Sequence, residues 1–176
     1  MLIELVAAND DHVRDYFAGV CPAWTGLNPA KPVLFVDINA LHDEHTRLVV
    51  EHIECLKIVL GSLPHVQLVF TEVSSEKGLF NSLMNGRYTP LHEIVPRVCD
   101  TISMAPLASL PRSEIIRSYA ESHALHTYIA LEPEGDDADG KSNWILTYAR
   151  ARGLTAAKAN ELVELVTRRE IGYPRL

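Results

Sequence analysis

Apolar and polar residues follow one another along the chain in blocks that are typical of alternating strands and helices. One apolar run ends abruptly at Asp37, which predicts a buried strand over 33–37 with a carboxylate at its tip. Apolar positions then recur at helical spacing, which predicts an amphipathic helix over about 44–60 that Gly61 closes. A second apolar run predicts the next strand over 66–71.

The rest of the chain continues this alternation. The further predicted elements are a helix over 74–84, a short helix over 91–95, a strand over 100–104, a helix over 111–123, a strand over 127–131, a strand over 144–148 and a helix from Thr155. Strands and helices that alternate with short links imply a mainly parallel sheet with helices on both faces. The predicted fold is therefore α/β, a three-layer α/β/α sandwich whose loops at one edge form the site.

The first 30 residues differ from the rest of the chain. Residues 1–30 are predicted to be an N-terminal appendage, with a short strand, a brief helix and a proline-containing linker. Residues 31–176 form the predicted α/β domain. A chain of 176 residues is long enough for one domain that buries roughly two thirds of its unfolded surface.

Composition narrows the function classes. The formal charge of −7 and the absence of a cluster of Lys and Arg make a nucleic-acid partner unlikely. Cys21, Cys55 and Cys99 are far apart and odd in number, which argues against a disulfide framework or a zinc knuckle. No long apolar run and no basic leader occur, so the sequence predicts a cytoplasmic protein without membrane contact. The sequence does not identify a protein partner.

Polar residues stand where several predicted strands end. Asp37, Thr71 and Glu132 each follow an apolar strand, and Arg112 begins the helix that precedes the strand ending at Glu132. In a parallel sheet such ends meet at one edge, where ligands bind. A carboxylate nucleophile, a hydroxyl, a cation and a metal-binding acid together suit phosphoryl transfer.

These motifs resemble those of the haloacid-dehalogenase-like superfamily of phosphohydrolases, in particular the domains found in Swiss-Army-knife RNA repair proteins. The resemblance covers roughly residues 31–168, and the segments that carry it are 33–39, 69–71, Arg112 to Ile116, 128–132 and 153–155. It implies a Rossmann-like sheet with little or no cap, since only about 30 residues separate the first two motifs. It also implies that Asp37 is a nucleophile or metal ligand, that Thr71 and Arg112 surround the phosphate, and that Glu132 holds the metal.

The chain departs from the family pattern at Asn39, which replaces the second acid of the first motif. That acid protonates the leaving group and activates water, and an amide can do neither. Losing such a group costs about 10²- to 10⁴-fold in rate. The resemblance still allows a magnesium shell of Asp37, the Asn39 carbonyl and Glu132, and a water-mediated ligand would come from Glu134, Asp136 or Asp137.

The expected function is a divergent phosphohydrolase that acts on a small phosphorylated substrate with weak or no turnover. Two alternatives stay open: an inactive pseudoenzyme that serves as a binding or interaction module, and a nucleic-acid end-processing phosphatase that only the family resemblance suggests. His42 or His45 is a candidate base in place of the missing acid, although a surface pair explains them as well. Lys77 is an alternative cation. Asp37 also has a simpler interpretation, as a polar residue that ends a buried strand.

Overall fold

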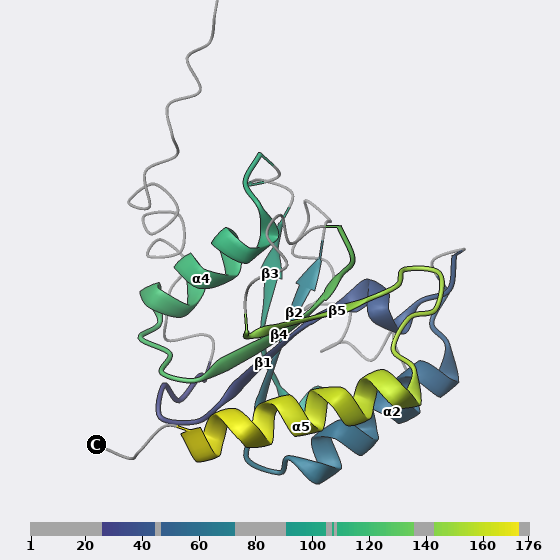
Figure 1. Cartoon of the computed structure of the whole chain (residues 1–176), viewed down its shortest axis with the longest axis horizontal. Coiled ribbons are helices and arrows are strands. Elements are labelled where there is room, and N and C mark those ends of the chain that lie inside the picture. The colour runs from purple at the N-terminus through teal and green to yellow at the C-terminus, as the bar shows by residue number, and fades with distance from the viewer. Residues whose placement is uncertain are drawn as a thin grey trace, which may run out of the picture.

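The computed structural model describes residues 26–44, 47–72, 91–104, 107, 109–135 and 143–172 (Figure 1). Several sequence predictions lie outside these ranges, namely the elements within residues 1–25, the helix over 74–84, and the candidates His45, Lys77, Asp136 and Asp137. Within the described ranges, no helix is both long enough and apolar enough to cross a bilayer.

Five strands form one sheet in which every neighbouring pair is parallel, in the order β3-β2-β1-β4-β5. The strands are β1 Val33–Asp37, β2 Gln67–Glu72, β3 Val98–Ser103, β4 Tyr128–Pro133 and β5 Ile145–Tyr148. The sheet confirms the predicted α/β class. The strand that carries Asp37 lies at its centre, between β2 and β4.

Successive side chains of a strand point to opposite sides of a sheet. The buried apolar residues of β1 are therefore divided between two core clusters, one on each face. Leu34 and Val36 of β1 belong to one core cluster, together with α2 Val50–Ser62 and α5 Ala156–Gly172. Phe35 belongs to the other, with α4 Arg112–Ser122. Figure 1 shows α2 and α5 together on one side of the sheet and α4 on the other. The fold is therefore a Rossmann-like α/β arrangement.

The predicted helix over 44–60 starts too early, since α2 begins only at Val50. Two contacts join described residues that precede α2. The Oδ1 atom of Asp43 accepts a hydrogen bond from the backbone N–H of Arg47 at 2.9 Å, and His42 and Leu48 form an isolated antiparallel bridge. The Asp43 side chain thus accepts the hydrogen bond that the Arg47 N–H would give to a backbone carbonyl within a helix.

Smaller differences concern the third and fourth strands. Residues 95–97 form a 3₁₀ turn, η4 Val95–Arg97, where a short helix over 91–95 was predicted. The strand β3 begins two residues earlier than predicted, and β4 continues to Pro133, so that Glu132 lies within the strand. The Arg97 guanidinium donates hydrogen bonds to the carbonyls of Leu60, Leu63 and Val66, which fixes the chain after α2.

Candidate functional site

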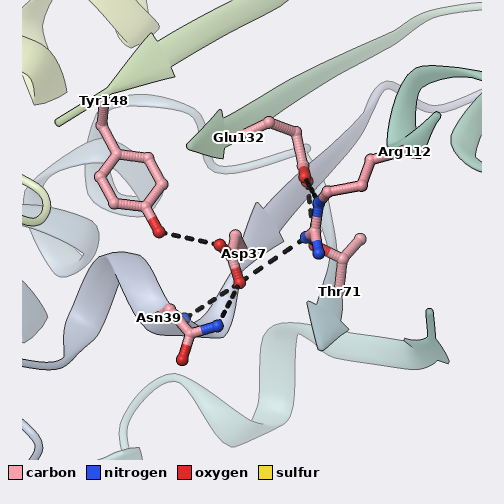
Figure 2. A network of polar contacts seen from close by, with 6 residues as sticks. All are labelled: Asp37, Asn39, Thr71, Arg112, Glu132 and Tyr148. Atoms are coloured by element: carbon pink, nitrogen blue, oxygen red, sulfur yellow. Dashed lines mark hydrogen bonds and ion pairs between the residues drawn. The ribbon is translucent and has the colours of Figure 1, made fainter. Parts of the chain in front are cut away.

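The register of the sheet brings the polar strand ends together. Asp37 lies directly opposite Thr71, and Glu132 follows Leu131, the partner of Val36. All three polar residues point to the face that α4 covers, since each lies two positions beyond an apolar residue of that core cluster. Arg112 is the first residue of α4 and reaches the same place (Figure 2).

Glu132 is bonded through both carboxylate oxygens. Oε1 accepts a hydrogen bond of 2.9 Å from the Thr71 hydroxyl, and Oε2 is ion-paired with Nε of Arg112. Nη2 of Arg112 also donates to the Thr71 hydroxyl at 2.9 Å and lies 3.7 Å from Oδ1 of Asp37. One guanidinium therefore contacts both buried carboxylates and the hydroxyl between them.

Asp37 is also bonded through both oxygens, and only 1% of its surface is exposed. Oδ1 accepts hydrogen bonds of 3.1 Å from the backbone N–H and from the side-chain amide of Asn39, and the first of these caps the 3₁₀ turn η2 Ile38–Leu41. Oδ2 accepts a 2.8 Å hydrogen bond from the Tyr148 hydroxyl. Asn39 thus acts on Asp37 as a donor.

Tyr148 is the member of this network that sequence reasoning missed. It is the last residue of β5, and its ring belongs to the core cluster beneath α2 and α5. Figure 2 shows its hydroxyl pointing at Asp37 from the side opposite Arg112. The only signal in the sequence is an aromatic residue with a polar tip at a strand end, a type that finds a hydrogen-bond partner when buried.

Burial controls the protonation of this network. It raises the pKa of Glu132 to about 7, and the charge of Asp37 acts in the same direction, whereas Arg112 and the Thr71 hydroxyl oppose the shift. Burial and the nearby charge of Asp37 also raise the pKa of Tyr148. The tyrosine therefore stays protonated and remains a donor to Asp37 at neutral pH.

His42, the described candidate for a replacement base, lies just after η2. Burial lowers its pKa, which the charges of Asp37 and Asp43 partly offset. Its Nδ1 atom is buried and has no hydrogen-bond partner among the described residues. His42 is thus a neutral imidazole near the network, and Asp37 makes its hydrogen bonds with other residues.

The predicted magnesium shell does not fit the residues as they stand. Each oxygen of Asp37 and Glu132 already accepts a hydrogen bond or ion pair, and the Asn39 carbonyl accepts a hydrogen bond of 3.1 Å from the backbone of His42. Glu134 is exposed. In the part of the chain that the structure covers, no group of three or more His, Cys, Asp or Glu side chains could hold a metal ion. The Arg112 guanidinium carries the positive charge that lies next to both carboxylates.

A close contact fixes the turn after Asp37. Gly153 has a φ of +59°, and the backbone N–H of Leu154 donates a 2.7 Å hydrogen bond to the carbonyl of Ala40 in η2. A Cβ atom on Gly153 would lie 2.3 Å from Cε1 of His52 and 2.8 Å from the Ala40 oxygen. Only glycine allows this segment to lie so close to η2.

Comparison with known proteins adds no further relationship, because no family model, curated protein or solved structure matches the chain.

Proposed function

We propose that this chain is a haloacid-dehalogenase-like domain whose former catalytic centre is now a closed polar network, and that it acts as a binding or interaction module without phosphohydrolase turnover. One observation carries this proposal: both oxygens of Asp37 accept hydrogen bonds, and the side chain is almost fully buried.

Several features support the family relationship. Asp37 ends the central strand, and the neighbouring strands supply Thr71 and Glu132 at the same edge of a parallel sheet. Arg112 comes from the start of the helix before β4. The described residues between β1 and β2 contain η2 and α2, in line with a three-layer sandwich that has little or no cap.

Catalysis by this network has two obstacles. A nucleophilic carboxylate must reach the phosphorus atom, whereas Asp37 is covered by the hydroxyl of Tyr148 and the amide of Asn39. A phosphate group would also have to displace Glu132 from Arg112 and Thr71. The net charge of −7 gives no support to a nucleic-acid end-processing role, since phosphate-backbone binding depends on clustered cations.

Hydrolysis of p-nitrophenyl phosphate and of a nucleoside monophosphate in the presence of Mg²⁺ tests the proposal. The wild-type protein should show no turnover above that of Asp37→Asn. The variant Asn39→Asp, which restores the family's second acid, should also stay inactive because Asp37 remains covered. Magnesium-dependent turnover that is present in the wild type and absent from Asp37→Asn would contradict the proposal, and so would activity gained by Asn39→Asp.

A further inference from the structure

Arg112 occupies an unusual position between two carboxylates from neighbouring strands. Its Nε atom is paired with Glu132, and its Nη2 atom lies 3.7 Å from Asp37. Only 8% of its surface is exposed, and both acids are 1% exposed. All three groups are thus removed from water together, at one end of the parallel sheet. Within the described ranges, Asp37 and Glu132 form ion pairs with no other cation.

Two adjacent buried carboxylates need a positive charge. Each ion loses its hydration on burial, and the two repel one another unless a cation lies between them or one takes up a proton. A divalent cation would meet this need with oxygen ligands. A guanidinium meets it with a planar fork of N–H donors, which suits two acceptors in fixed directions.

We infer that Arg112 is this protein's own replacement for a divalent cation, so that the wild-type chain does not use Mg²⁺ and removal of the guanidinium creates a divalent-cation site between Asp37 and Glu132. The inference rests on the proposed function, since it takes the network to be a closed part of the fold. Within that proposal, the inference explains why Asp37 and Glu132 lie side by side although the predicted magnesium shell does not fit them.

The first arm of the test uses the wild-type chain. Its Tm should be the same with MgCl₂ or MnCl₂ as with NaCl at matched ionic strength, and electron paramagnetic resonance should detect no bound Mn²⁺. Bound Mn²⁺ that is lost in Asp37→Asn would overturn the inference, because the cation would then share the network with Arg112.

The second arm removes the guanidinium. Arg112→Gln should lower the Tm by roughly 10 °C without divalent ions. Mn²⁺ should recover part of this loss, and electron paramagnetic resonance should detect Mn²⁺ bound to Arg112→Gln at concentrations at which the wild type binds none. The matched control is Arg112→Gln combined with Glu132→Gln, which should show no recovery. A folded Arg112→Gln that does not respond to Mn²⁺ would overturn the inference.

Arg112→Lys keeps the test decisive if Arg112→Gln does not fold. Lysine keeps one positive charge at the same place, so this variant should fold and gain no stabilisation from Mn²⁺. Stabilisation of Arg112→Lys by Mn²⁺ would overturn the inference, since charge would not be what excludes the metal. Phosphatase turnover without a metal requirement would refute the proposed function alone, whereas Mn²⁺ binding to an inactive wild type would refute this inference alone.

Discussion

Asp37 is a residue whose chemistry depends on its neighbours. An apolar strand delivers it into the interior, where an ionised carboxylate is unstable unless donors replace its lost water. Asn39 and Tyr148 supply those donors, and the Arg112 guanidinium lies close by. Both oxygens of this carboxylate therefore act as hydrogen-bond acceptors within the fold.

Replacing Tyr148 by Phe tests this role directly. The change removes only the hydroxyl and leaves Oδ2 of Asp37 without its donor, so we expect the free energy of unfolding to fall by about 1–3 kcal/mol. Urea unfolding followed by circular dichroism measures the loss. The same replacement in an Asp37→Ala background should cost much less, and an equal cost in both backgrounds would show that the hydroxyl does not act through Asp37.

The protonation of Glu132 and Glu72 gives a second test. Burial raises the pKa of Glu132 and of Glu72 to about 7, from 4.5 when they are exposed. Between these pH values the unfolded chain releases protons that the folded chain keeps, so both groups make stability fall as the pH rises from about 4.5 to about 7. His42 acts in the opposite direction, because its pKa is lowered on folding.

Comparison of variants separates these contributions. Glu132→Gln cannot ionise, so its stability relative to the wild type should improve by about 1–3 kcal/mol as the pH rises from about 4.5 to about 7. Glu72→Gln should change in the same direction. Chemical unfolding at several pH values measures both differences. A stability gap between Glu132→Gln and the wild type that stays constant over this range would contradict the assigned shift.

Among the secondary-structure elements, η2 positions the donors of Asp37, and the position of η2 depends on its contacts with the segment after β5. The segment that follows β5 bonds to the Ala40 carbonyl and brings Gly153 against His52. The turn after Asp37 therefore has a fixed position, and so do the two Asn39 donors that bond to the carboxylate.

Two glycine replacements should have opposite effects. Gly153→Ala places a Cβ atom 2.3 Å from the His52 ring in a left-handed conformation, so we expect a loss of about 2–4 kcal/mol in the free energy of unfolding. Gly61 lies within α2, and no described atom outside its own helix backbone lies within 4 Å of an added Cβ, so Gly61→Ala should stabilise the protein by about 0.5–1 kcal/mol. Thermal unfolding distinguishes the two. A neutral Gly153→Ala would show that the segment is not held against η2.

For the fold as a whole, sequence patterns predicted the elements that depend on short stretches of the chain. The apolar run before Asp37 predicted β1, and alternating strands and helices predicted the parallel sheet. The predicted start of α2 was wrong because the Asp43 side chain bonds to the backbone N–H of Arg47, a contact that helical periodicity does not reveal. Periodicity describes which face a residue occupies and says little about where a helix begins.

The contacts that define the network could be predicted only in part. Polar strand ends in a parallel sheet indicated that Asp37, Thr71 and Glu132 would lie close together, and they do. The partner of each oxygen was not predictable, because it depends on register and side-chain direction across the sheet. Tyr148 bonds to Asp37 over 111 positions, and no local pattern connects them.

The coupling energy between Arg112 and Glu132 tests most sharply whether these side chains form a closed, buried network with Asp37. Free energies of unfolding of the wild type, Arg112→Gln, Glu132→Gln and the double variant, measured without divalent ions, form a double-mutant cycle. If the two side chains form a buried pair that belongs to the fold, the cycle gives a coupling of about 1–3 kcal/mol. A coupling of zero within error would contradict the claim, because it would mean that the network is not closed in solution.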